Sequence, residues 1–198
     1  MNKRLLYILT LIVAVGFALA LGGCNKSDDD DDNDNNGDDD NDDFTATSIS
    51  FTPAGEAQAG DIWLELAESA PAKNTFTLNV RGNAIAETYG VAGRLLFDRE
   101  LTSLDSAEPG DALAGNDAQI KALGGSNDQG GVFGISRSGD YTHSVTLDAA
   151  KIIGTLQFTV SAAGTTDITF NEERSTILNH DFELAEVSNW LGGTLVVE

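Results

Sequence analysis

The chain has 198 residues, 41% of them hydrophobic, and a formal net charge of −21 from 32 Asp and Glu against 11 Lys and Arg. So acidic a chain lacks the basic stripe that neutralises phosphates, which excludes nucleic acid as a partner. Its one cysteine has no second cysteine for a disulfide within the chain. A folded domain therefore has to be stabilised by its apolar core.

Residues 1–23 have the pattern of a secretory signal. A basic start precedes an apolar run from Leu5 to Leu21, and two glycines then supply the small residues that a signal peptidase needs. The stretch from Ala20 to Cys24 resembles the lipobox of bacterial lipoproteins, in which the cysteine is acylated and becomes the mature N-terminus. The resemblance implies export and lipid anchoring at Cys24 to a bacterial membrane, with the outer membrane or cell surface preferred. An uncleaved membrane anchor is the alternative.

Residues 24–43 form an acidic linker after this signal. From Asp28 to Asp43, 11 of 16 residues are Asp and the others are Asn and Gly. A block of like charges without apolar residues cannot offset the entropy lost on folding, so we expect a disordered and extended tether. Part of the tract also matches a calcium-loop pattern, and loose calcium binding is the minor alternative. Its oxygen ligands would be Asp32, Asp34, Asn36 and Asp43.

Residues 44–198 are long enough for one domain with a sizeable core, and their pattern is that of β-strands. Apolar residues alternate with polar ones from Phe76 to Val80 and again from Leu156 to Val160. Gly-rich turns are expected at 124–127 and 192–193. These patterns predict an all-β sandwich of two antiparallel sheets. We expect further strands at 62–66, 91–97, 132–136, 167–170 and 194–197, and short helical turns at 116–123 and 181–187.

The order of these segments resembles that of a cohesin module, the receptor half of cohesin–dockerin pairs. The first alternating strand leads to an aromatic-Asp step at Phe97-Asp98 and a loop at 107–111. Later, 154–160 fits Gly-x-Leu-x-Phe-x-Val, and a Gly-Gly pair precedes the last strand. The resemblance covers about residues 62–198. It implies a jelly-roll sandwich of about nine strands that is not an enzyme and binds a protein partner, such as a dockerin-bearing protein, through one sheet face.

Two other functions stay open at this point. Carbohydrate-binding modules share the architecture, so a module for envelope or extracellular polysaccharide is the runner-up, and a structural envelope subunit is the third reading. A flat face with an apolar centre would favour a protein partner, whereas exposed aromatic side chains lined up along one sheet would favour a glycan. We expect Trp63 and Trp190 in the core, and Tyr89 and Tyr141 exposed.

Outward positions on two strands are the candidate partner contacts. The first set is Thr75, Thr77, Asn79 and Arg81 on the alternating strand, and the second is Arg94 and Leu96 on the strand before the aromatic-Asp step. In dockerin-binding cohesins the latter strand presents polar contact residues. Here its outward alternation consists of Gly90, Ala92, Arg94 and Leu96, which departs from that pattern.

Catalytic and metal-binding chemistry has little support in this sequence. His143 and His180 are the two histidines, and we expect both to be ordinary surface or loop residues. Two histidines without available cysteines cannot supply the usual zinc ligand sets, and no cofactor is expected. The Gly-rich stretch at 124–131 lacks the Lys of a phosphate-binding loop and is expected to be a mobile loop. An oxygen-only calcium site drawn from Asp98, Asp105, Asp111 and Asp117 is the alternative.

Overall fold

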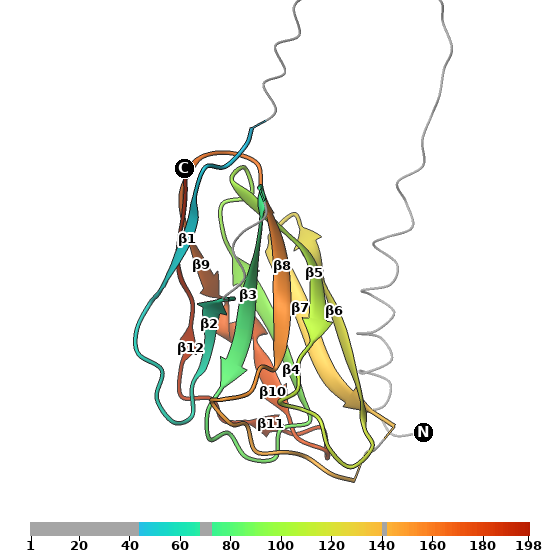
Figure 1. Ribbon diagram of the computed structural model, residues 1–198. Coiled ribbons are helices and arrows are strands. Elements are labelled where there is room, and N and C mark those ends of the chain that lie inside the picture. The colour runs from blue at the N-terminus through green and yellow to red at the C-terminus, as the bar shows by residue number, and fades with distance from the viewer. Residues whose placement is uncertain (1–43, 68–72, 140–141) are drawn as a thin grey trace, which may run out of the picture. The chain divides into compact units, whose positions relative to one another are not determined.

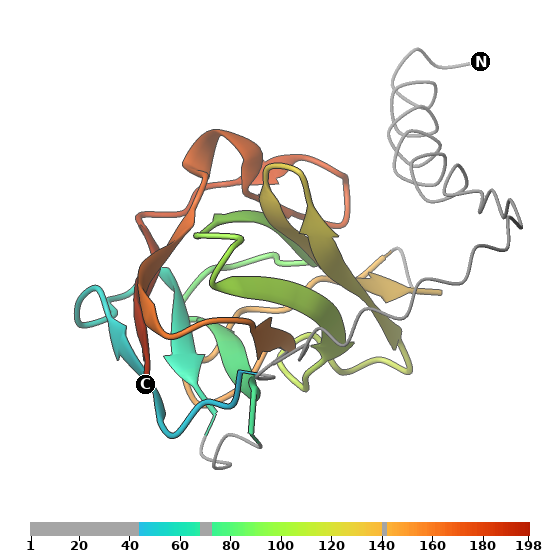
Figure 2. The same ribbon diagram turned by 90° about the horizontal axis from the view of Figure 1, so that it is seen from above.

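The computed structural model describes residues 44–67, 73–139 and 142–198, which form a sandwich of two β-sheets (Figures 1 and 2). The expected all-β architecture is confirmed, although the strands are divided into thirteen segments rather than about nine. No helix in this part of the chain is long and apolar enough to cross a membrane. The signal segment, Cys24 and the calcium-loop residues of the linker lie outside the described residues.

The smaller sheet has five strands in the order β12-β2-β3-β8-β5. Its strands pair antiparallel, apart from β12 and β2, which run parallel. A bulge between Leu104 and Ser106 shifts the register of β5 against β8. The bounds are β2 Ile62–Leu66, β3 Thr75–Gly82, β5 Thr102–Pro109, β8 Gly154–Val160 and β12 Trp190–Leu191.

The larger sheet has eight strands, and β4 lies at its centre. On one side β4 pairs with β7, which pairs with β6; on the other it pairs with β9 near Leu95 and with β10 near Val91. The outer strands are β13 and β1 beyond β9, and β11 beyond β10. The bounds are β1 Ile49–Pro53, β4 Gly90–Leu96, β6 Gln119–Asn127, β7 Gly130–Ser138, β9 Gly164–Phe170, β10 Thr176–Leu178, β11 Leu184–Ala185 and β13 Gly193–Val197, with a 3₁₀ turn at Glu172–Arg174 between β9 and β10.

The core lies between the sheets, where the alternating strands place their apolar residues. Phe76 lies opposite Phe158 across β3 and β8, and the two rings stack with centroids 5.0 Å apart. Both rings are buried, and burial of each such side chain contributes about 1.5–3 kcal/mol. The same core cluster includes, from the larger sheet, Val91, Leu95, Phe133, Ile135, Ile168, Phe170 and Leu195. The two alternating strands predicted from the sequence are therefore confirmed.

The segment that follows the acidic linker is part of the fold. Strand β1 pairs with β13, and Asn74 holds the residues before β1: its Oδ1 accepts a hydrogen bond from the Ala46 N–H at 2.9 Å, and its Nδ2 donates to the Phe44 carbonyl. The Glu198 carbonyl accepts from the N–H groups of Thr47 and Ser48. The described residues from Phe44 onward are therefore part of the fold.

The expected helical turns are wrong. Residues 119–127 form β6, which pairs with β7 along nine positions. Ile120 and Ala122 are half-buried while Lys121 and Leu123 are exposed, which is a period of two. Long-range pairing with β7 overrides the local helix propensity of this stretch. The second segment, 181–187, consists of a turn, the short strand β11 and the residues that follow it.

The Gly-rich stretch at 124–131 is a hairpin instead of a mobile loop. Residues 124–127 belong to β6, and the chain turns at Asp128 and Gln129. A methyl group at Gly124 would lie 2.7 Å from the Cβ of Ala107 on β5, so this glycine allows two strands to approach closely. Likewise, the expected loop at 107–111 begins within β5, which extends to Pro109.

The burial of the aromatic residues agrees with the sequence prediction at some positions and contradicts it at others. Tyr89 was expected to be exposed, but it is 4% exposed. Trp63 was expected in the core, yet it is half-buried and points from the outer side of β2, because its neighbours Ile62 and Leu64 occupy the core. Trp190 does pack against the core, with its ring 5.1 Å from that of Phe170. Tyr141 lies outside the described residues.

Candidate functional site

The six predicted contact residues lie on two different sheets. Thr75, Thr77, Asn79 and Arg81 alternate with the core residues of β3 on the outer side of the five-stranded sheet, although Asn79 is only 7% exposed. Arg94 and Leu96 belong to β4 and lie on the outer side of the eight-stranded sheet. Because the core separates the two sheets, these sets face away from each other (Figure 1). One flat partner surface cannot contact both sets.

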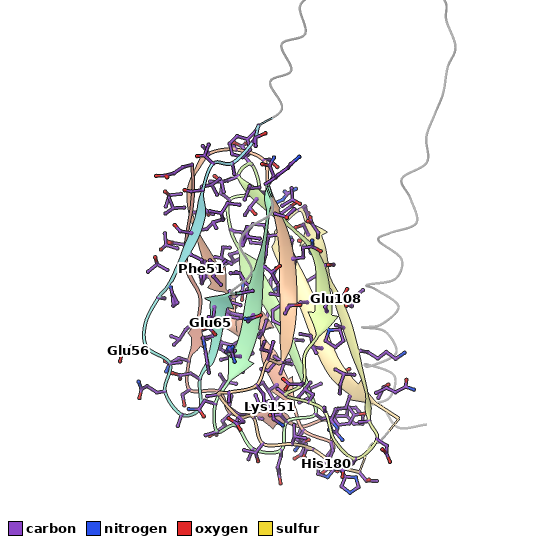
Figure 3. The ribbon with its side chains drawn as sticks, in the orientation of Figure 1. Phe51, Glu56, Glu65, Glu108, Lys151 and His180 are labelled. Atoms are coloured by element: carbon purple, nitrogen blue, oxygen red, sulfur yellow. The ribbon has the colours of Figure 1, made fainter. Side chains whose placement is uncertain are left out.

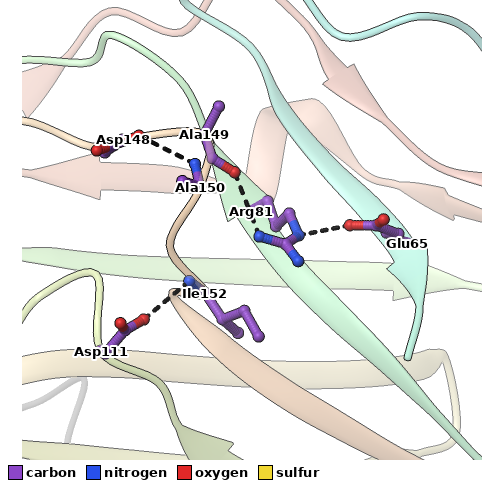
Figure 4. A network of polar contacts seen from close by, with 7 residues as sticks. All are labelled: Glu65, Arg81, Asp111, Asp148, Ala149, Ala150 and Ile152. Atoms are coloured by element: carbon purple, nitrogen blue, oxygen red, sulfur yellow. Dashed lines mark hydrogen bonds and ion pairs between the residues drawn. The ribbon is translucent and has the colours of Figure 1, made fainter. Parts of the chain in front are cut away.

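The outer face of the five-stranded sheet is polar, and many of its side chains bond one another. Arg81 forms an ion pair through Nε with Glu65 and donates from Nη1 to the Ala149 carbonyl at 3.2 Å (Figure 4). Asp105 accepts a hydrogen bond from Thr159 at 2.6 Å. Carboxylates lie across this sheet, including Glu65 on β2 and Glu108 on β5 (Figure 3). This face resembles an ordinary solvated surface.

The outer side of β6, β7, β4, β10 and β11 carries mainly small and aliphatic residues, whereas β9 of the same sheet presents Asp167. In one row across the strands, Leu123 lies opposite Gly134, Gly134 opposite Ala92, and Ala92 opposite Thr176. The next row is Lys121, Ser136, Gly90, Leu178 and Leu184. We call these two rows, with Leu96, the acid-free face. Glycine, alanine and serine at its middle leave a flat surface with aliphatic side chains around it.

The acid-free face is an exception on an acidic domain. Residues 44–198 carry 21 Asp and Glu against 8 Lys and Arg, a formal charge of −13. Strands β4, β6, β7, β10 and β11 nevertheless contain no Asp or Glu. Three of the four large hydrophobic residues exposed in the described structure belong to these strands: Leu96 (40% exposed), Leu123 (65%) and Leu184 (74%). Exposed apolar residues that share one face are typical of interaction sites, so the acid-free face is the candidate contact surface.

Arg94 occupies an outward position on β4, but its guanidinium is mostly buried. It is 9% exposed, and its Nη2 lies 3.4 Å from Oδ1 of Asn127 at the end of β6. Its backbone N–H donates to the Ser175 hydroxyl at 3.2 Å. The guanidinium is therefore held against the sheet, and Lys121 supplies the exposed cation of this face.

The two histidines lie in loops at one end of the sandwich, where Figure 3 labels His180. His180 Nδ1 lies 3.5 Å from the Ser144 hydroxyl, and Nε2 lies 3.5 Å from a carboxylate oxygen of Asp181. A catalytic triad needs these contacts at about 2.6–3.2 Å, with the base held by a third, well-positioned group. Here the carboxylate belongs to the adjacent residue and is 69% exposed, so the arrangement is that of a surface loop.

Three of the four aspartates considered for a calcium site serve separate local contacts. Asp98 accepts from the Glu100 N–H, Asp105 from Thr159, and Asp111 from the Ile152 N–H, each at 2.6–3.0 Å. Among the described residues, no group of three or more His, Cys, Asp or Glu side chains could hold a metal ion.

The domain was compared with known proteins. No protein-family model matches the sequence, and no curated protein sequence matches it. Solved structures do match. A type II cohesin domain from the cellulosome of Acetivibrio cellulolyticus superposes with a TM-score of 0.54 at 9% identity, over 70% of this chain and 95% of that one. The domain has a cohesin-like fold. The resemblance inferred from the order of the sequence segments is thereby confirmed at the level of fold.

Two further structures agree with this assignment. The second type II cohesin module of the adaptor ScaA scaffoldin of A. cellulolyticus gives a TM-score of 0.54 at 15% identity, over 70% of this chain and 91% of that one. The sixth cohesin of scaffoldin B of the same organism, solved in complex with a Cel5 dockerin mutant, gives 0.50 at 12% identity, over 69% and 97%. At such low identity these matches establish the architecture of the cohesin-like domain.

The most exposed part of the acid-free face was not predicted from the sequence. Leu123 lies in a segment, 116–123, that was expected to be a helical turn, and Leu184 lies in another, 181–187. Neither leucine was therefore expected on the outer side of a strand. The signal that could have revealed the face is compositional: about 30 residues from five segments of an acidic chain lack any carboxylate.

Proposed function

We propose that the chain is a non-catalytic protein-binding lipoprotein that displays its cohesin-like domain at the cell envelope and binds a dockerin-type partner on the acid-free face. The observation that carries the proposal is the flat, carboxylate-free surface with exposed leucines on a domain of charge −13. Such a surface can exclude water against a complementary protein without desolvating carboxylates. A cohesin of the same architecture was solved with a dockerin bound, which supports a partner of this class.

The composition of the face favours a protein over a polysaccharide. Flat glycan-binding surfaces use exposed aromatic rings for stacking on sugars. Among the described outward residues of β4, β6, β7, β10 and β11, none is aromatic. Of the residues predicted as contacts, Leu96 and Arg94 lie on this face, and the four residues of β3 lie on the opposite one.

Envelope display rests on the sequence. A lipid-modified Cys24 would anchor the chain, and the acidic linker would hold the domain away from the lipid headgroups. We place the domain at the outer membrane or cell surface.

A charge placed at the middle of the face tests the proposal. Full-length chain is purified in detergent as wild type, Ala92→Arg and Thr77→Arg, and each is used to capture proteins from the secreted and envelope fractions of the source organism, beside a polysaccharide array. We expect a dockerin-bearing protein to bind the wild type and the Thr77→Arg control, and binding to Ala92→Arg to fall at least 100-fold, because an arginine there is desolvated without a partner. Equal capture by all three, or retention on glycans alone, would refute the proposal.

A further inference from the structure

The hairpin between β10 and β11 is an ordered feature at the edge of the acid-free face. Asn179 organises its turn: Oδ1 accepts hydrogen bonds from the N–H groups of Asp181 at 3.0 Å and Glu183 at 2.8 Å. The Asn179 N–H donates to the Glu183 carbonyl, and its own carbonyl accepts from the Phe182 N–H. Four hydrogen bonds thus define a turn of a few residues.

This turn holds an aromatic side chain in a strained backbone conformation. Phe182 has a φ of +61°, which is unfavourable for a bulky residue and which Gly or Asn would adopt more easily. Its ring contacts Tyr89 edge-on with centroids 5.9 Å apart, yet the residue remains 48% exposed. The chain reversal does not require phenylalanine here, and residues held in sparsely populated backbone conformations are enriched at functional sites.

Leu184 continues the apolar surface of this hairpin. It lies opposite Leu178 across the strand pair, in the row of the acid-free face that includes Gly90. It is 74% exposed, the highest value among the large hydrophobic residues of the described structure. The strands themselves contain no carboxylate, but the turn and the residue after β11 carry exposed ones, those of Asp181, Glu183 and Glu186.

We infer that Phe182 and Leu184 are an anchor that inserts into an apolar socket of the protein partner, and that lysine or arginine side chains line the rim of that socket. The inference rests on the proposed function and extends the interface from the flat strands to the hairpin. The turn is already ordered, so little conformational entropy is lost when the anchor binds. Side chains that become fully desolvated in a well-packed pocket of the partner carry most of the binding energy, and the three carboxylates select a basic rim by charge complementarity.

Site-specific photo-cross-linking tests the contact in cells of the source organism. A benzophenone side chain is placed at position 184, 92 or 77 of the full-length chain, and the cells are irradiated. We expect the same protein to be cross-linked from positions 184 and 92 and no such adduct from position 77, on the opposite face. An adduct from position 92 without one from 184 would overturn the anchor and leave the proposed function intact. Absence of the adduct from both positions would overturn the anchor and the protein-binding face together.

Affinity measurements then test whether the two side chains contribute to binding. The cross-linked protein is purified and titrated with full-length wild type, Leu184→Ser, Leu184→Met and Phe182→Gly. Leu184 is 74% exposed and Phe182 48%, so both can be replaced without a large loss of core packing. We expect 10- to 100-fold weaker binding for Leu184→Ser and Phe182→Gly, and binding within threefold of wild type for Leu184→Met. Glu183→Gln should make the affinity less dependent on salt. Wild-type affinity in Leu184→Ser, or an unchanged salt dependence in Glu183→Gln, would contradict the socket or its basic rim, respectively.

Discussion

Replacement of Gly93 by alanine tests how closely side chains pack on the core side of the larger sheet, behind the acid-free face. Gly93 lies on the core side of β4, and a methyl group there would be 2.5 Å and 2.6 Å from two ring carbons of Phe133. Carbon atoms in contact are normally 3.5–4.0 Å apart, so the ring would have to move by about 1 Å. Phe133 is 4% exposed and contacts Phe170 edge-on with centroids 6.3 Å apart, which leaves it little room.

The expected cost follows from this geometry. Overpacking a well-packed core costs about 1–3 kcal/mol, and we expect about 2 kcal/mol here because two buried rings must shift. For a domain of this size, that lowers Tm by about 4–8 °C. The measurement is equilibrium unfolding of the full-length chain in urea, with circular dichroism of the β-sheet signal as the probe.

Gly134→Ala is the matched control. Gly134 lies on β7 next to Phe133, but its Cβ would point outward and meet nothing within 4 Å. Its free energy of unfolding should stay within about 1 kcal/mol of wild type, or rise slightly because alanine restricts the unfolded chain. Phe133→Leu combined with Gly93→Ala should be more stable than the sum of the single effects predicts. Equal stability of Gly93→Ala and Gly134→Ala would refute the packing argument.

Three further substitutions test other contacts. Asn74→Ala removes two hydrogen bonds to the segment before β1. We expect the free energy of unfolding in urea to fall by about 1–3 kcal/mol and proteolysis near residue 46 to become faster. Proteolysis at the wild-type rate would contradict a role of Asn74 in holding this segment. Arg137→Met leaves the carbonyls of Leu113 and Gly115 without their guanidinium donor. We expect the free energy of unfolding to fall by about 2–4 kcal/mol, and unchanged stability would refute this role of Arg137. Cys24→Ser should abolish labelling by radioactive palmitate and release the chain from the membrane fraction, whereas retained labelling would exclude acylation at this cysteine.

The strand pattern was readable because burial of a half-covered strand imposes a period of two on its sequence. The residues from Phe76 to Val80 and from Leu156 to Val160 alternate in the chain and pack face to face in the core. The order of such strands was enough to indicate a cohesin-like sandwich. Alternation of this kind is local, so it can be recognised in one segment without knowing which strand pairs with it.

Lipidation at Cys24 and calcium binding in the acidic linker remain predictions, since both lie outside the described residues. The six predicted contact residues alternate with core residues on β3 and β4, and their role as partner contacts remains a prediction; Asn79 and Arg94 are only 7% and 9% exposed. Their division between two opposite faces could not be foreseen, because alternation identifies the outer side of a strand but not the sheet to which that strand belongs.

What the sequence by itself determined was the class of fold, the acidic character and the identity of the core strands, all of which follow from composition and local periodicity. Tertiary structure alone decided that residues 119–127 are a strand, because pairing with β7 outweighs a modest helix propensity. It also decided which side chains gather on one surface: Ala92, Leu123 and Leu184 come from distant segments, and only the pairing of β6, β7, β4, β10 and β11 places them on a common face.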